Sequence, residues 1–221
     1  VWVGNWGSGL NLLNRETNEV EHYSTNHTAN HYLPDDYVHV IFEDHNGKVW
    51  IGTRNGALIF DEKERVFVPI QQYFSTAAIP SFKNIRINSI IQDKNDNYWF
   101  GTQNGLYKVN FSDTSYIFFT ADKETEPRLS GNYIYELLED SDGLIWIAES
   151  SGLDVYNPKN QKFTHYQKNN TTETSLCDNF VVALCEDYQG NIWIGTNTGV
   201  NRFVKKDSIF EFYYKEAELP A

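Results

Sequence analysis

The chain has 221 residues, of which 40% are hydrophobic and 15% aromatic, so it can form a sizeable core and is not a disordered tract. Its formal net charge of −12 argues against a surface that binds nucleic acid or anionic lipid, because proteins that bind phosphate groups usually present a basic face. No apolar run approaches the roughly 20 residues of a membrane-spanning helix, and no signal peptide stands at the start. The sequence lacks Met and begins within a repeated motif, so we expect an excised or processed piece.

Tryptophans recur along the chain at an almost constant spacing. Trp2, Trp50, Trp99, Trp146 and Trp193 are separated by 48, 49, 47 and 47 residues. A fixed period in this range is typical of propellers and solenoids. Around each of the last four Trp residues an Asp stands six positions before and a Gly six positions after: Asp44 and Gly56, Asp93 and Gly105, Asp140 and Gly152, Asp187 and Gly199.

Each period predicts four short strands. A segment such as "VHVIFED" (38–44) is apolar enough for a strand buried on both faces, and a turn such as "HNG" follows, where Gly can adopt a positive φ. In "DKNDN" (93–97), Asp96 takes the Gly position, and we expect Asn97 to share the left-handed conformation. The Trp strand, a third strand and an aromatic fourth strand follow. No 3.6-residue apolar pattern supports a helical repeat instead.

The sequence therefore predicts an all-β fold, a β-propeller of four-stranded antiparallel blades, with about five repeats in a single region, residues 1–221. In chain order we expect a partial blade at 1–23 and complete blades at about 37–69, 86–120, 133–166 and 180–214. An open arc would leave strand edges unpaired. We expect the chain to form part of a larger wheel, and a compact five-bladed ring with one weakly closed blade is the alternative.

The repeated pattern D-x-x-G-x-[IV]-W-[IV]-G-T-x-x-G-[LV], with its aromatic outer strand, resembles the two-component regulator propeller repeat. That repeat occurs in the sensor regions of hybrid two-component systems of Bacteroidetes. The resemblance implies a seven-bladed propeller in the periplasm, ahead of a histidine kinase, that senses oligosaccharides or helps to assemble the sensor dimer. No part of this chain matches a kinase, a receiver or a DNA-binding module, so we expect a non-enzymatic sensing region without direct membrane contact.

Two copies depart from the pattern at the same turn. Ala148 and Glu149 replace the Gly and Thr of the motif in the fourth copy, while the first copy has Asn5 and Trp6 and one extra residue before Gly9. Adaptation of single blades for recognition explains these changes, and ordinary drift in a repeat array explains them about as well.

Recognition is expected where the copies differ, because every blade needs the same packing but a ligand does not need the same residue on every blade. The recurring Trp, Thr, Gly and Asp therefore indicate scaffold, with the Asp residues bonding turn amides. Two sets of loops share one face of a propeller: the segments between blades, which here include Tyr73 and Phe74, and the turns after the Trp strands. The candidate ligand-binding residues in these loops are Trp6, Arg54, Asn55, Arg86, Asn104, Arg128, Tyr133, Glu149 and Asn197.

Aromatic rings, planar amides and guanidinium groups suit sugars, and they equally suit a protein interface. An oligosaccharide ligand and a sensor homodimer are therefore the expected partners, and a purely structural assembly propeller is the alternative. A weaker alternative is a propeller lyase of the streptogramin-inactivating type, which would need His and Glu near a metal, whereas the His residues here do not recur near Glu149.

Other chemistry has little support. His22, His27 and His31 lie close together but match no common zinc spacing, and no Ser, His and Asp constellation indicates a nucleophile. We expect no metal and no cofactor. Cys177 and Cys185 leave a disulfide and two free thiols both open.

Overall fold

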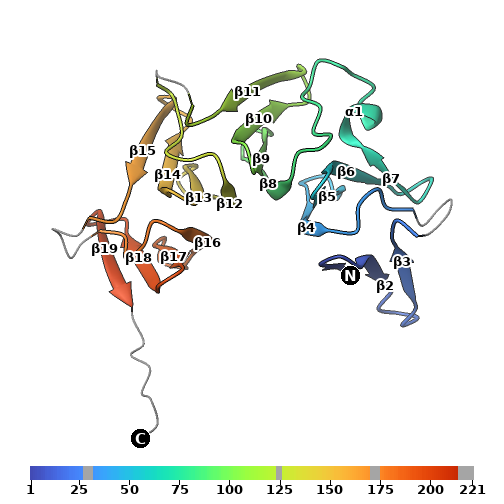
Figure 1. Ribbon diagram of the computed structural model, residues 1–221, viewed down its shortest axis with the longest axis horizontal. Coiled ribbons are helices and arrows are strands. Elements are labelled where there is room, and N and C mark those ends of the chain that lie inside the picture. Colours follow the sequence, from blue (N-terminus) through green and yellow to red (C-terminus); the bar gives the residue numbers. More distant parts are fainter. Residues whose placement is uncertain (27–31, 123–125, 170–174, 214–221) are drawn as a thin grey trace, which may run out of the picture. The chain divides into compact units, whose positions relative to one another are not determined.

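In the described part of the chain, the strands form five antiparallel sheets that follow one another in chain order (Figure 1). The computed structural model describes residues 1–26, 32–122, 126–169 and 175–213. His27 and His31 lie outside these residues, as does the end of the predicted blade at 180–214. The chain divides into two compact units, Val1–Phe118 and Phe119–Ala221. Among the described residues, no helix is long and apolar enough to cross a membrane.

The first sheet has three strands and the other four have four each, as the repeat predicts. The first contains β1 (Trp2–Asn5), β2 (Gly9–Leu13) and β3 (Val20–Tyr23). The second contains β4 (Val38–Glu43), β5 (Val49–Thr53), β6 (Gly56–Asp61) and β7 (Val66–Pro69), and the third β8 (Ile87–Gln92), β9 (Tyr98–Thr102), β10 (Leu106–Asn110) and β11 (Ser115–Phe119). The fourth contains β12 (Ile134–Glu139), β13 (Ile145–Glu149), β14 (Gly152–Asn157) and β15 (Lys162–Tyr166). The fifth contains β16 (Val181–Glu186), β17 (Ile192–Thr196), β18 (Val200–Val204) and β19 (Ile209–Tyr213).

In every complete sheet the recurring Asp joins the first turn to the Trp. The Oδ1 atom of Asp44 accepts hydrogen bonds from the backbone amides of Asn46 and Lys48, and its Oδ2 atom accepts one from Trp50 Nε1 at 2.9 Å. Burial alone would raise the pKa of Asp44, but the bonds from Trp50 and the turn amides outweigh it and hold that pKa below its usual range. The other three Asp–Trp bonds measure 2.8, 2.7 and 3.0 Å: Asp93 with Trp99, Asp140 with Trp146, and Asp187 with Trp193.

The second turn is closed by the recurring Thr. Thr53 Oγ1 donates to the carbonyl of Gly56 and accepts from the amide of Asn55, and Thr102 and Thr196 make the corresponding bonds to Gly105 and Gly199. The Gly residues at 56, 105 and 152 have φ between 136° and 148°, a region that other residues rarely adopt. The predicted scaffold roles of Asp, Trp and Thr are therefore confirmed.

The core lies between neighbouring sheets. Trp50 and Ile59 of the second sheet pack with Phe100 of the third, and Trp146 of the fourth packs with Phe203 of the fifth at 5.4 Å between ring centroids. Aromatic side chains contribute much of this buried area. Each sheet thus depends on its neighbour for a core.

Each complete sheet has the same irregularity at the start of its first strand. The register of β4 against β5 shifts between Val38 and Val40, which leaves His39 as a bulge. The same shift occurs in the other three sheets, at Asn88, Tyr135 and Val182. Because a bulge re-aims the side chain that it carries, these four positions differ in direction from a regular strand.

Two details differ from the sequence-based expectation, and the structure also gives the state of the two cysteines, which the sequence left open. Asp96 adopts the left-handed conformation with φ of 59°, but Asn97 does not; its side chain bonds to Asp93 instead. Tyr73 and Phe74, expected among the recognition loops, belong to the single helical turn α1 (Ile70–Tyr73) and to the residue after it, and Phe74 stacks on the ring of Phe111 at 4.2 Å. Cys177 and Cys185 are not bonded to each other.

We expect Asp93→Asn to destabilise the protein by about 1–3 kcal/mol. A carboxylate offers acceptor oxygens to both Trp99 and the turn amides, whereas an amide has one acceptor oxygen, so one set of donors would stay buried without a partner. Chemical denaturation measures the effect.

Asp113→Asn is the matched control, because Asp113 is exposed and any donor of Ser115 that loses its partner there can bond to water. Equal unfolding midpoints for the two variants would contradict the role of Asp93.

Candidate ligand-binding face

A backbone hydrogen bond joins the two sets of variable loops in every complete blade. The residue after each Trp strand donates to the carbonyl of the residue just before the first strand, at 3.1 to 3.3 Å. The pairs are Arg54 with Tyr37, Gln103 with Arg86, Ser150 with Tyr133, and Asn197 with Phe180. Within each complete sheet the most variable residues therefore lie side by side at one end.

In the first unit these loops form a group that we call the Trp6 cluster: Trp6, Asp35, Tyr37, His39, Arg54 and Arg86. The Trp6 side chain is 76% exposed, and its ring meets His39 edge to face at 5.7 Å. The guanidinium of Arg86 lies 6.0 Å from the centre of the Trp6 ring. Three of the predicted site residues, Trp6, Arg54 and Arg86, are thus brought together.

Arg54 is held in place from two sides. Its guanidinium lies 4.2 Å from the centre of the Tyr37 ring, and its Nε atom lies 3.8 Å from Oδ2 of the buried Asp35. Asp35 Oδ1 in turn accepts the backbone amide of Tyr37. The Arg54 side chain remains 61% exposed, so most of its donors face solvent.

His39 lies at the centre of this cluster because of the bulge in β4. Burial, and then the nearby positive charge of Arg86, lower the pKa of His39 below its ordinary value. A neutral imidazole has one donor and one acceptor nitrogen. Among the described residues, its Nε2 atom is buried and has no hydrogen-bond partner.

Asn55 and Asn104 are exposed, and their side chains are not among those that make up the Trp6 cluster. Asn55 lies at the edge of a separate pocket of about 450 Å³, together with Ile70, Gln72 and Phe82. Arg54 and Asn55 are adjacent in the turn, but their side chains therefore lie at different surfaces.

In the second unit, Tyr133 begins a short row of rings. The ring centroids of Tyr133 and Tyr135 are 4.7 Å apart, and those of Tyr135 and Phe180 are 5.0 Å apart. Asn197 is exposed, and its backbone amide donates to the carbonyl of Phe180. Tyr135 enters this row through the bulge in β12.

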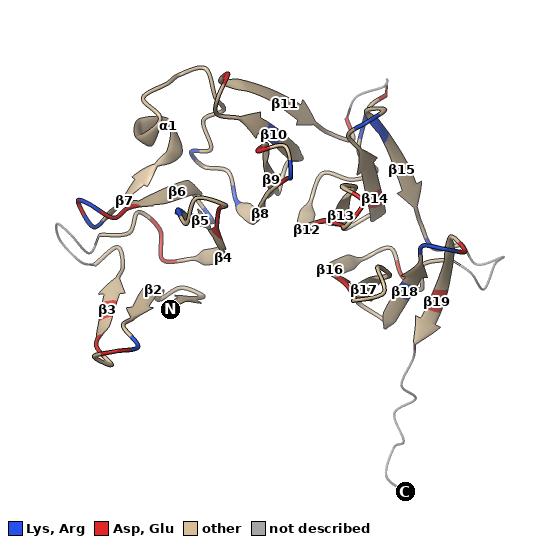
Figure 2. Cartoon of the chain, turned by 180° about the vertical axis from the view of Figure 1, so that it is seen from behind, with Lys and Arg blue, Asp and Glu red and all other residues tan. Residues whose placement is uncertain are grey.

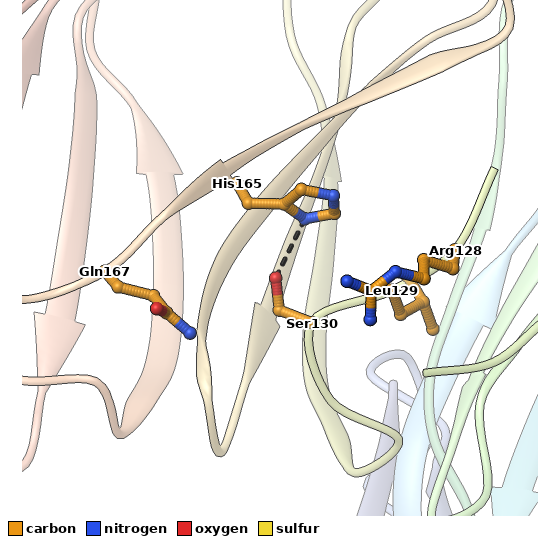
Figure 3. A pocket seen from close by; sticks show the side chains of 5 residues that line it. All are labelled: Arg128, Leu129, Ser130, His165 and Gln167. Atoms are coloured by element: carbon orange, nitrogen blue, oxygen red, sulfur yellow. Dashed lines mark hydrogen bonds between the residues drawn. The ribbon is translucent and has the colours of Figure 1, made fainter. Parts of the chain in front are cut away.

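Arg128 lies elsewhere in the second unit, at a pocket of about 260 Å³. Figure 3 shows the lining residues, which are Arg128, Leu129, Ser130, His165 and Gln167. Arg128 Nε lies 3.4 Å from a carboxylate oxygen of Glu126. Arg128 and Tyr133 are therefore parts of two different features.

Ser130, His165 and Asp154 meet beside this pocket, but they do not form a catalytic triad. Ser130 Oγ donates to Asp154 Oδ1 at 2.7 Å, and both atoms approach the same nitrogen of His165, Nδ1, at 2.8 and 2.6 Å. In a triad, Ser and Asp contact opposite nitrogens of the imidazole. The bond to Asp154 raises the pKa of His165, which favours the imidazolium.

Asp154 instead anchors the segment between the third and fourth sheets. Its Oδ2 atom accepts the backbone amide of Ser130 at 2.8 Å. Asn201, at the corresponding position of the fifth sheet, accepts the backbone amide of Cys177 at 2.9 Å. The second residue after the turn Gly thus fastens the preceding loop in both sheets.

Glu149 is fully buried beneath this segment, so its carboxyl group does not lie on the exposed face with the other predicted site residues. A Cβ atom on Gly131 would come within 2.5 Å of Glu149 Oε2. The carboxyl group of Glu149 lies close to Asp154 and to the backbone amides of Ser130 and Gly131. Burial, and then the charge of Asp154, raise the pKa of Glu149 far above its usual value of 4.5, so at neutral pH it is a neutral acid able to share its proton with Asp154.

Several of these residues were not predicted from the sequence. Asp35, His39, Tyr135, Ser130 and Asp154 belong to the clusters but not to the candidate set. Asp154 had a signal, since Asn11 and Asn201 take the same place in other repeats. Among the described residues, no group of three or more His, Cys, Asp or Glu side chains is arranged to hold a metal ion.

We expect Glu149→Gln to remove part of the pH dependence of stability. The folded protein holds a proton on Glu149 that the unfolded chain releases above about pH 4.5, so the free energy of unfolding falls as pH rises from there toward the raised pKa. The slope from one such group is at most about 1.4 kcal/mol per pH unit. Denaturation of both proteins between pH 5 and pH 9 measures it.

The exposed Glu62 provides the control, as Glu62→Gln changes the same group without burial. Parallel pH profiles for the original protein and Glu149→Gln would show that Glu149 is ionised in the folded state.

The chain is similar to parts of bacterial sensor proteins. It is 33% identical over 78 residues to histidine kinase P4 of Formosa agariphila, a match that covers 34% of this chain and 6% of that protein. Two solved structures from Bacteroides thetaiotaomicron also match. They are the extracellular domain of a putative hybrid two-component system (26% identity, TM-score 0.75, covering 96% of this chain and 27% of that one) and that of a putative one-component system (21%, 0.74, 97% and 26%).

Virginiamycin B lyase from Staphylococcus aureus shares the fold alone, with 14% identity and a TM-score of 0.65 over 96% of this chain and 64% of the lyase. The chain thus spans only a small part of the kinase and about a quarter of the two sensor domains.

The family description "Two component regulator propeller" matches four stretches, residues 32–55, 81–104, 128–150 and 175–198. Each stretch begins before the first strand of a complete sheet and ends at the turn after the Trp strand. Four stretches of the chain, one for each complete sheet, are therefore two-component regulator propeller repeats.

Proposed function

We propose that this chain is a non-enzymatic, periplasmic sensor module of a two-component signalling protein, and that it binds an oligosaccharide at the Trp6 cluster. The observation that carries the proposal is the exposed Trp6 ring, held at the variable end of the blades among polar side chains. The similarity to the extracellular domain of a putative hybrid two-component system supports the location and the sensing role. The kinase activity would lie in other parts of the parent protein.

The cluster has the two kinds of group that sugar recognition needs. An exposed aromatic face offers a platform for the axial C–H groups of a pyranose ring, and Trp6 provides that face. Hydroxyl groups of the sugar need fixed donors and acceptors, which Arg54, His39 and Arg86 offer from neighbouring segments. Because these side chains are positioned by strand ends, the site is largely formed before a ligand arrives.

The proposal of a non-enzymatic role agrees with the geometry around Ser130. Its hydroxyl proton is directed to Asp154, and His165 contacts both residues through one nitrogen. Ser130 therefore lacks a general base placed as in a hydrolase.

We expect Trp6→Ala to weaken oligosaccharide binding by roughly tenfold or more, because truncating an aromatic anchor commonly costs about 2 kcal/mol. Calorimetric titration of the intact sensor region against a panel of glycans measures the affinity. Trp6→Tyr, which keeps a ring, should retain part of the binding.

Asn104→Ala is the control, since Asn104 is an exposed turn residue outside the cluster. A panel without any binding glycan, or equal affinities for the Trp6 and Asn104 variants, would contradict the proposal.

The row of rings in the second unit favours a second candidate function, assembly of the sensor dimer. Phe180 is 37% exposed beside Tyr135, and aromatic residues are enriched at protein interfaces. In this case the row would contact a second protomer, and sugar recognition would remain at the Trp6 cluster or in other parts of the parent protein.

If the row is an interface, Phe180→Ser should shift the sensor region from dimer to monomer in analytical ultracentrifugation while sugar binding is unchanged. Tyr188→Ser is the control, because Tyr188 is 97% exposed in the turn between β16 and β17 and stands outside the row. A dimer that survives the Phe180 change but dissociates with Tyr188→Ser would move the interface to the opposite end of the sheet.

A further inference from the structure

The Trp6 cluster has a charge that contrasts with the rest of the chain. The formal net charge of the chain is −12, and charged residues lie mainly in turns and at strand ends (Figure 2). Yet the cluster brings together two guanidinium groups, Arg54 and Arg86, and one carboxylate, Asp35. Because arginine does not lose its proton at physiological pH, the cluster keeps one positive charge in excess.

Both guanidinium groups are held near the exposed ring. Arg86 lies over Trp6 at 6.0 Å and is close enough to His39 to lower its pKa. Arg54 rests on Tyr37, which forms an isolated β-bridge with Trp6. A sugar ring on Trp6 would therefore have a guanidinium within reach on more than one side.

Asp35 cannot neutralise both groups. It is buried, it uses Oδ1 to accept the amide of Tyr37, and its Oδ2 lies 3.8 Å from Nε of Arg54. The terminal nitrogens of Arg54 remain available on its exposed side. His39 adds no second anion and, when neutral, no competing cation.

The formal net charge of −12 would repel an anionic ligand. The two arginines of the Trp6 cluster reduce that repulsion locally. Guanidinium groups bind carboxylate and sulfate oxygens through paired, charge-assisted hydrogen bonds, which are stronger than those to neutral hydroxyls. A neutral sugar would use the same donors less well.

We propose that the Trp6 cluster binds an acidic saccharide, with a sugar ring on Trp6 and a carboxylate or sulfate group held by Arg86 and Arg54. This inference rests on the proposed sensing function and names the class of ligand for that same site. Carboxylate and sulfate share the relevant chemistry, and the experiment separates them.

The experiment uses matched pairs of oligosaccharides and the intact sensor region. Each uronate-containing oligosaccharide is compared with its carboxyl-reduced form, and each sulfated one with its desulfated form, by calorimetric titration at two salt concentrations. We expect at least one acidic form to bind on the order of tenfold tighter than its neutral partner, with an affinity that falls as salt rises. The pair that shows the difference identifies the anionic group.

Substitutions then locate the effect. Arg86→Gln and Arg54→Gln should remove most of the preference for the acidic form, so that the affinities of the acidic and neutral forms converge. Arg128→Gln is the matched control, because Arg128 belongs to a separate pocket in the second unit. The proposal would be overturned if Arg128→Gln removed the preference for the acidic form while Arg86→Gln and Arg54→Gln kept it.

The outcomes also separate this inference from the sensing function. Neutral glycans that bind as well as or better than every acidic partner would overturn the acidic class while the sensing function stands. If neither acidic nor neutral glycans bind, both proposals fall.

Discussion

The hydrogen bond from the Trp indole to the recurring Asp is the interaction on which each complete blade depends. One buried carboxylate satisfies two turn amides and the Trp, so the first turn and the second strand are fixed together. The same carboxylate also joins neighbouring sheets: Tyr98 donates to Asp44 at 2.8 Å, and Lys205 lies 2.8 Å from Asp140. In the second and fourth sheets, the recurring Asp therefore supports both its own blade and the contact with the following sheet.

This anchoring at one end leaves the other end of each blade free to vary. The turn after the Trp strand is attached to the start of the first strand through backbone atoms, so its side chains can change without loss of the attachment. That freedom explains why Arg54, Gln103, Ser150 and Asn197 differ while their backbone bonds persist. It also explains why a candidate ligand site can be built from these positions at little cost in stability.

The fourth blade shows a different use of the same freedom. Glu149 replaces the Thr that closes the turn elsewhere and becomes a buried acid beside Asp154. Asp154, with Ser130 and His165, holds the loop above it. The departure from the motif therefore changes the interior of the blade. The residues that line the exposed pocket in this unit are Arg128 and its neighbours instead of Glu149.

The sequence alone determined the repeat, the antiparallel blades and the scaffold roles of Asp, Trp, Thr and Gly, because these residues recur at a constant spacing and each has a local reason to do so. It also indicated Trp6, Arg54 and Arg86, since they stand where the copies differ. Only the tertiary structure placed these three beside His39 and Asp35, separated Asn55 from them, and buried Glu149. Those outcomes depend on contacts between residues far apart in the chain and on a strand bulge that no recurring residue marks, since the four bulge positions carry His, Asn, Tyr and Val.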